Sequence, residues 1–72
     1  MDYILVCFCY EDRTEDLKIP TFVPVEDLIT LFCELFGAKG KVLHAEPRGI
    51  ILDKNKTLAE QGVEHGAVLT LE

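Results

Sequence analysis

Residues 49–63 of this chain, which read GIILDKNKTLAEQGV, say the most about its architecture. A glycine turn leads into a short apolar strand, Ile50–Leu52, and a polar turn follows it. Thr57 can then cap a helical turn while Glu60 reaches back to the Thr57 backbone, an arrangement known as a capping box. After this turn the chain closes with an apolar run that predicts a final strand at Val68–Leu71.

The N-terminal third predicts a β-hairpin. Residues 3–10, YILVCFCY, are rich in the aromatic and β-branched side chains that favour strands, and residues 17–19, LKI, alternate between apolar and polar. The polar residues between these two runs predict the turn. Both alternating sets of residues 3–10 are apolar, so the period does not choose the buried face. We expect the bulkier set to face the core, namely Ile4, Val6 and Phe8.

Helical spacing replaces the strand pattern at Val25. From there the apolar residues fall on one broad face, which contains Val25, Leu28, Ile29, Phe32, Leu35 and Phe36. Glu26 and Asp27 occupy the first turn, where the helix dipole favours negative charge, and Gly37 supplies a stop. Residues 41–45, KVLHA, predict a third strand after the helix.

The predicted order of elements is strand, strand, helix, strand, short strand, helical turn and strand. It describes one α+β domain over residues 1–72, with a mixed sheet of four to five strands packed on one main helix. This order resembles the β-grasp fold of the ubiquitin superfamily over essentially the whole chain. The residues that match ubiquitin-like core and turn positions are Leu17, Ile19, Val25, Leu28, Gly49, Leu52, Thr57, Leu58, Val63 and Leu69.

Two stretches resemble one bacterial branch of that superfamily, the YukD/EsaB family. The first runs from Asp16-Leu17-Lys18-Ile19 to Pro24-Val25-x-x-Leu28-Ile29, and the second is Thr57-Leu58-x-x-x-Gly62-Val63-x-x-Gly66-x-x-Leu69. Small cytosolic proteins of that family accompany type VII, or WXG100, secretion systems of Gram-positive bacteria. The chain departs from the family in its Cys-Phe-Cys run and in a short segment between the helix and the third strand.

The resemblance implies a cytoplasmic bacterial accessory protein that docks on other proteins, with a type VII secretion ATPase or a membrane component as the expected partner. It leaves self-association open. The alternative is a ubiquitin-like modifier or sulfur-carrier protein, whose C-terminal carboxylate is activated as an adenylate or thioester. Such chemistry uses a flexible Gly-Gly tail, whereas this chain ends in Leu71-Glu72. We therefore expect a protein that is bound rather than conjugated.

The charge and the hydropathy pattern exclude two classes of partner. A net charge of −6 at pH 7 disfavours binding to the phosphates of nucleic acid. No apolar run approaches the roughly 18–20 residues of a membrane helix, and the N-terminus lacks the basic flank of a signal peptide, so no membrane insertion is expected. Residues 37–56 carry an excess of Lys and Arg, which indicates either a basic rim that steers an acidic partner or a mixed solvated surface.

The three cysteines predict neither a metal site nor catalysis. A structural zinc site takes four ligands in paired spacings, which Cys7, Cys9, Cys33 and two scattered histidines do not provide. A cysteine nucleophile needs a base and a lowered pKa, and no motif supports one. We expect no cofactor and no enzymatic activity, with the cysteines acting as small apolar residues.

The exposed face of the sheet is the predicted interaction surface. Alternation predicts that the second set of residues 3–10 lines the face away from the helix, together with one or both of Ile50 and Ile51. A contiguous apolar patch usually marks a contact surface, although scattered apolar residues also occur without one. The candidate partner-binding residues are Leu5, Cys7, His44, Arg48, Ile50 and Lys54.

Overall fold

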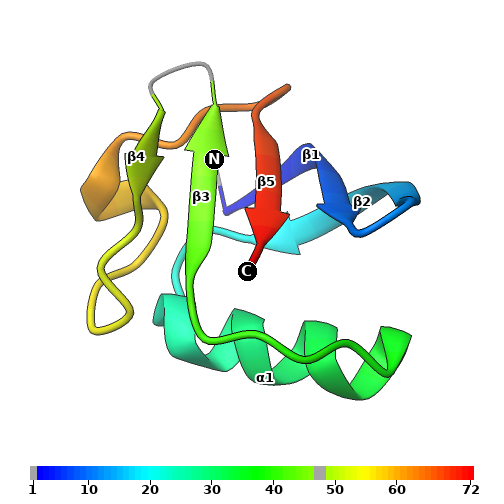
Figure 1. The fold of residues 1–72 in the computed structure, drawn as a ribbon. Coiled ribbons are helices and arrows are strands. Elements are labelled where there is room, and N and C mark those ends of the chain that lie inside the picture. Colours follow the sequence, from blue (N-terminus) through cyan, green and yellow to red (C-terminus); the bar gives the residue numbers. More distant parts are fainter. Residues whose placement is uncertain (1, 47–48) are drawn as a thin grey trace.

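The computed structural model describes residues 2–46 and 49–72, and in these ranges one helix packs against one face of a five-stranded sheet (Figure 1). The elements are β1 Tyr3–Tyr10, β2 Arg13–Pro20, α1 Val25–Phe36, β3 Leu43–Glu46, β4 Ile50–Ile51, the 3₁₀ turn η1 Ala59–Gln61 and β5 Val68–Leu71. The strand order is β2-β1-β5-β3-β4, in which β1 and β5 are parallel and the other neighbours antiparallel. The predicted α+β, ubiquitin-like β-grasp arrangement is confirmed.

The buried face of β1 is the one predicted from side-chain bulk. Ile4, Val6 and Phe8 are at most 5% exposed, and the ring of Phe8 stacks on that of Phe32 in α1 with 4.3 Å between centroids. Such stacked aromatic pairs stabilise a core beyond the area that they bury. Elsewhere in the described chain, five residues around this stack are no more than 1% exposed: Val25, Leu28, Leu43, Leu58 and Leu69.

β2 is longer than the predicted strand 17–19, because it begins directly after a two-residue turn at Glu11 and Asp12. Strand pairing uses the backbone, so the polar side chains of residues 13–16 can extend the strand while they stay in water. β2 is the outermost strand of the sheet, where such side chains find solvent. Glu11 accommodates the tight turn with a φ of 53°.

α1 has the predicted bounds, and it ends at Gly37 in the left-handed conformation with a φ of 62°. Its start is capped in a way that the sequence does not reveal. The N-cap residue is Pro24, whose side chain makes no capping bond. Instead, the N–H groups of Val25 and Glu26 donate to the carbonyls of Lys56 and Lys54, at 2.9 and 3.0 Å. The loop after β4 therefore caps the N-terminus of α1.

The strands that follow α1 are shifted or shortened from the predicted bounds 41–45 and 50–52. Residues 41 and 42 do not continue β3 but donate their N–H groups to the carbonyl of Glu72. This close approach of residues 41 and 42 to the C-terminal residues requires glycine at position 40, because a Cβ atom there would lie 2.7 Å from Cγ of Leu71. Leu52 lies just beyond β4, where it is 5% exposed and bonded through its N–H to the carbonyl of Leu43.

The predicted capping box is present before η1. The Thr57 N–H donates to Oε1 of Glu60 at 2.9 Å, and the Glu60 N–H donates to Oγ1 of Thr57 at 3.1 Å. Hydrogen bonds from the Thr57 backbone and side chain lower the pKa of the Glu60 carboxyl. Of the two predicted anchors of this turn, Leu58 is fully buried, whereas Val63 is half-buried against the core.

The described residues contain no helix that is both long enough and apolar enough to cross a membrane.

Candidate docking face on the sheet

The face of the sheet away from α1 is built by the odd-numbered residues of β1 and their neighbours across the strands. This outer face contains Tyr3, Leu5, Cys7 and Cys9 of β1, Thr14, Asp16 and Lys18 of β2, Val68 and Thr70 of β5, His44 and Glu46 of β3, and Ile51 of β4. Side chains on a strand alternate between faces. Because Ile4, Val6 and Phe8 are buried under α1, each of these residues must lie on the opposite face.

The strand register arranges this outer face in rows. One row runs Cys9, Thr70, His44 and Ile51, and the next runs Asp16, Cys7, Val68 and Glu46. Leu5 lies one row beyond Cys7, beside Lys18. The structure therefore brings Leu5 and Cys7 together on β1, and it places His44 two strands across from Cys9.

Three large apolar side chains of the outer face are exposed to solvent. Tyr3 is 48% exposed, Leu5 45% and Ile51 64%. Tyr3 extends this apolar surface beyond the sheet, because its ring meets the edge of the Phe22 ring at 5.7 Å, and Phe22 is itself 57% exposed. Nζ of Lys18 lies 5.8 Å from the centre of the Tyr3 ring. The apolar surface is thus largest at the start of β1.

Cys7 is a poor nucleophile in this position. Desolvation raises the pKa of its thiol, and a hydrogen bond with the Cys9 thiol together with the nearby charges of Cys9 and Asp16 raises it further. A thiol with a raised pKa stays protonated, whereas the thiolate is the reactive form. All three cysteines are free.

His44 does not pair with a cysteine. Thr70 stands between His44 and Cys9 in the same row, so about two strand spacings, roughly 10 Å, separate them. Nε2 of His44 lies 2.5 Å from Oε2 of Glu72 instead. Within residues 2–46 and 49–72, no three His, Cys, Asp or Glu side chains are grouped so that they could hold a metal ion.

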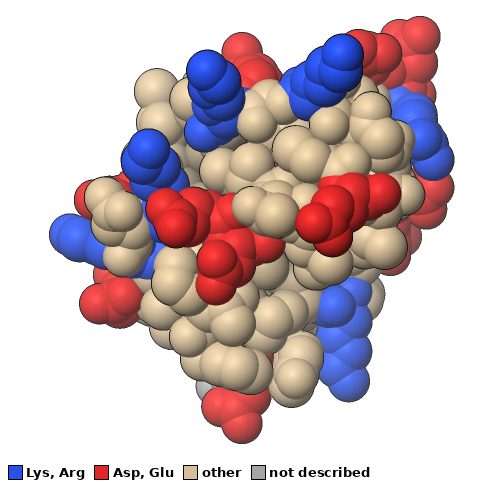
Figure 2. Space-filling model, turned by 90° about the horizontal axis from the view of Figure 1, so that it is seen from below, with Lys and Arg blue, Asp and Glu red and all other residues tan. Residues whose placement is uncertain are grey.

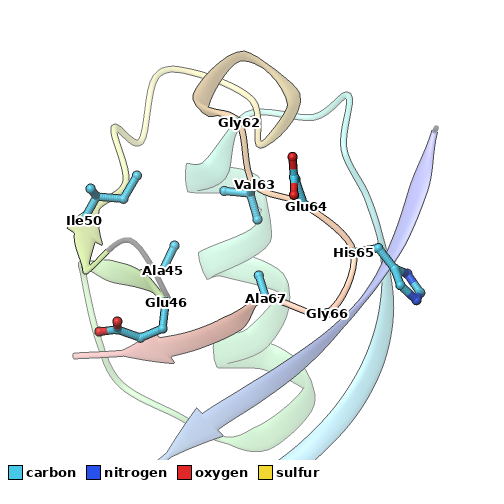
Figure 3. Close-up of a pocket in the computed structure, with 9 residues that line it drawn as sticks. All are labelled: Ala45, Glu46, Ile50, Gly62, Val63, Glu64, His65, Gly66 and Ala67. Atoms are coloured by element: carbon cyan, nitrogen blue, oxygen red, sulfur yellow. The ribbon is translucent and has the colours of Figure 1, made fainter.

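Ile50 does not belong to the outer face, unlike its neighbour in the sequence. The register pairs Ile50 with the buried Ala45, and Ile51 with His44. Ile50 therefore packs partly against the core and lines an open hollow of about 290 Å³ between β4 and the segment 62–67 (Figure 3). The sequence Ile-Ile carries no alternation, which is why the two residues could not be assigned to faces without the pairing of β4.

Of the two predicted basic residues, Lys54 does not lie on the outer face. Lys54 lies beside the first turn of α1, on the helix side of the sheet, where its carbonyl accepts from Glu26. Arg48 lies outside the described residues. Seen from the α1 side, Lys and Arg side chains are spread around the molecule with carboxylates between them (Figure 2).

Sequence reasoning missed the residues that join this face through loops. Phe22 lies between Pro20, which ends β2, and Pro24, which precedes α1, and this position gives no signal of its contact with Tyr3. His65 turns away from the hollow (Figure 3) and towards β1, where its Nδ1 accepts the N–H of Leu5 at 3.1 Å. Only the parallel pairing of β1 with β5 brings residues 60 positions apart into this contact.

A known protein family covers nearly the whole chain. The family described as "WXG100 protein secretion system (Wss), protein YukD" matches residues 3–71. The chain belongs to the YukD family. Among curated proteins, no sequence matches the chain.

Solved structures share the fold of this YukD-family chain. The ubiquitin-like domain of the Mycobacterium tuberculosis type VII secretion protein EccD1 is 24% identical, with a TM-score of 0.65 over 99% of this chain and 98% of that one. The ubiquitin-like domain of Plasmodium falciparum Dsk2 is 20% identical, with a TM-score of 0.72 over 97% and 99%. The C-terminal ubiquitin-like domain of mouse tubulin-specific chaperone e is 15% identical, with a TM-score of 0.80 over 97% and 84%. The chain is a ubiquitin-like domain of a secretion-associated family.

Proposed function

We propose that this YukD-family protein is a non-conjugated adaptor that docks on a protein component of a WXG100-type secretion system through the outer face of its sheet. The contact residues are Leu5, Cys7, His44 and Ile51. The observation that carries the proposal is the exposure of Tyr3, Leu5 and Ile51 on that face.

Apolar exposure favours binding over a role in folding. Moving an exposed Leu or Ile side chain into a protein contact gains on the order of 1–3 kcal/mol, since the apolar area leaves water. In the free domain the exposed parts of these side chains contribute no such energy. Interfaces combine apolar with polar residues, and here Lys18 lies beside Leu5, Asp16 beside Cys7 and His44 beside Ile51.

A secretion component is the expected partner because of the family. The YukD family is described by its association with the WXG100 system, and a domain of the same fold belongs to the type VII protein EccD1. A secretion ATPase or a membrane component of the apparatus fits this association. Binding is favoured over catalysis because the raised pKa of Cys7 keeps that thiol protonated, whereas the thiolate is the nucleophile.

The test is capture of a secretion component by matched variants. The intact chain is used as bait in native cytosol and detergent-solubilised membranes of a bacterium with a WXG100 system, and the prey is identified by mass spectrometry. Leu5→Asp combined with Ile51→Asp should reduce capture of the component at least about tenfold. Leu35→Asp is the control, because Leu35 is 63% exposed on α1, away from the outer face.

Two results would overturn the proposal. Equal capture by the folded double variant would remove the outer face from the contact. Recovery of an activating enzyme, or of covalent adducts through the C-terminus, would show that the protein is a conjugated modifier.

A further inference from the structure

The edge of the sheet at β2 is open along eight residues. β2 pairs only with β1, and within the described ranges no other strand lies beyond it. An open edge presents unpaired N–H and C=O groups that can pair with another chain. This edge is distinct from the outer face, because its donors and acceptors lie in the plane of the sheet.

The register identifies which backbone groups are free. In β1 the Cys7 N–H donates to the Ala67 carbonyl and the Leu5 carbonyl accepts from the Gly66 N–H, so these residues turn their backbone towards β5. The N–H and C=O groups of the even-numbered residues of β1 must then point towards β2, where they pair with the backbone groups of Glu15, Leu17 and Ile19. The residues between them, Thr14, Asp16 and Lys18, direct their N–H and C=O groups away from the sheet.

The charge at this edge favours a basic partner. Glu11, Asp12, Glu15 and Asp16 are all exposed in β2 or in its turn, and none of them forms an ion pair with a described residue. The two cations of the strand are turned towards aromatic rings instead. The guanidinium of Arg13 lies 5.4 Å from the centre of the Phe36 ring, and Nζ of Lys18 lies over Tyr3. The carboxylates are therefore left as the dominant charge along the open edge.

We propose that β2 accepts an extended, basic segment of a partner protein as an additional strand. Main-chain hydrogen bonds to Thr14, Asp16 and Lys18 supply the pairing, and the neighbouring carboxylates select for Lys or Arg. On the helix side, side chains of the added strand lie beside Glu15 and the half-buried Leu17, and on the outer face they lie beside Asp16. A position beside Leu17 suits an apolar residue and positions beside Glu15 or Asp16 suit Lys or Arg, so the recognised segment combines basic and apolar side chains.

A second copy of this chain is disfavoured at the same edge in the register centred on Asp16. Pairing two β2 strands antiparallel about Asp16 places Asp16 opposite Asp16 and each Glu15 opposite Leu17 of the other copy. Like charges directly across a sheet are destabilising. The inward-pointing Glu15 also protects the free edge from self-pairing, as charged edge residues do in other sheets.

The test measures whether a bound peptide protects the outward-facing amides of β2 from hydrogen exchange and leaves the amides already paired with β1 unchanged. The ¹⁵N-labelled intact chain is titrated with the peptide acetyl-KVKVKVKV-amide and, as a control, with acetyl-EVEVEVEV-amide. The basic peptide should slow amide hydrogen exchange of residues 14, 16 and 18 at least about fivefold, the loss of one exposed donor each, while residues 15, 17 and 19 change little. The acidic peptide should leave all six unchanged.

A matched pair of variants isolates the backbone donor. Asp16→Pro removes the outward N–H and the charge, and proline is tolerated where an edge N–H faces solvent. Asp16→Asn removes the charge but keeps the N–H. We expect the proline variant to bind the basic peptide at least about fivefold more weakly than the asparagine variant, as for one lost hydrogen bond.

Several outcomes would overturn the inference. These are equal protection of odd and even residues of β2, equal peptide binding by the two Asp16 variants, or protection of residues 14, 16 and 18 that rises with protein concentration alone, which would indicate a second copy. The uncharged double variant Leu5→Ser with Ile51→Ser should bind the basic peptide normally. Failure of the outer-face proposal and failure of this one are thereby distinguishable.

Discussion

The two faces of β1 carry similar side chains but differ in their exposure to solvent. Ile4, Val6 and Phe8 are buried under α1, whereas Tyr3 and Leu5 on the other face remain about half exposed. A strand between polar and apolar surroundings usually alternates in composition as well as in direction. Here composition does not alternate, so the apolar residues of the outer face are surplus to the core. That surplus is the physical basis for a docking surface.

The largest difference in stability between the two faces of β1 is expected between the variants Phe8→Ala and Cys7→Ala. Phe8 stacks on both Phe32 and Phe36, so its truncation should destabilise the fold by about 3–5 kcal/mol. This is a large part of the roughly 4–11 kcal/mol expected for 72 residues. Cys7→Ala, one position away on the half-buried outer face, should change stability by about 0.5 kcal/mol or less. Urea denaturation followed by circular dichroism measures both, and similar losses would contradict the assignment of faces.

Gly40 allows the segment 40–42 to lie against the end of β5. Gly40→Ala places a methyl group 2.7 Å from Cγ of Leu71 and 2.9 Å from the Glu72 carbonyl, so one of them must move. The expected destabilisation is about 1–3 kcal/mol, measured by the same denaturation. Gly37→Asn is the control, since asparagine tolerates the left-handed conformation of that open site. A neutral Gly40→Ala would show that the segment 40–42 is not held against the C-terminal strand.

A smaller effect is expected at the capping box. Thr57→Ala removes the side-chain acceptor of the Glu60 N–H and should cost about 1 kcal/mol of stability. Thr57→Ser keeps the hydroxyl and serves as the control. If serine and alanine destabilise the protein equally, the cap contributes through packing and not through its hydrogen bond.

The smallest predicted effect is a change in pH dependence from Glu60. Its pKa is lowered in the folded state, so the unfolded chain takes up a proton first as the pH falls. The stabilisation from this carboxylate is present above the ordinary pKa of about 4.3 and is lost as the pH falls through the folded value. Between pH 5 and pH 3, Glu60→Gln should therefore lose less stability than the unchanged protein.

A matched carboxylate tests whether the capping bonds cause this effect. Glu34→Gln removes an exposed carboxylate of α1 and should keep the pH dependence of the unchanged protein. The same flattening in Glu34→Gln and Glu60→Gln would attribute the effect to net charge.

The sequence was sufficient for the elements that periodicity and capping define. The helix bounds, the buried set of β1, the capping box and the resemblance to the YukD family are all confirmed. Periodicity fails where pairing decides the outcome. β2 extends through polar residues because its edge is solvated, and Ile50 and Ile51 are separated only by the register with β3.

Contacts across long sequence distances were equally hidden. The capping of α1 by the carbonyls of Lys54 and Lys56 leaves no signature in either segment. The same holds for the ring contact of Phe22 with Tyr3 and for the steric need for glycine at position 40. Each depends on how the chain closes in three dimensions, so the candidate site could be assigned to a face but not to its complete set of residues.

The outer face is tested most directly by methyl-group NMR of the complex with the captured secretion component. The methyl resonances of Leu5, Val68 and Ile51 are expected to shift or broaden on binding, while those of Leu35 on α1 stay unchanged. Shifts confined to Leu31 and Leu35, with Leu5 and Ile51 unaffected, would place the contact on the helix and exclude the outer face as the docking surface.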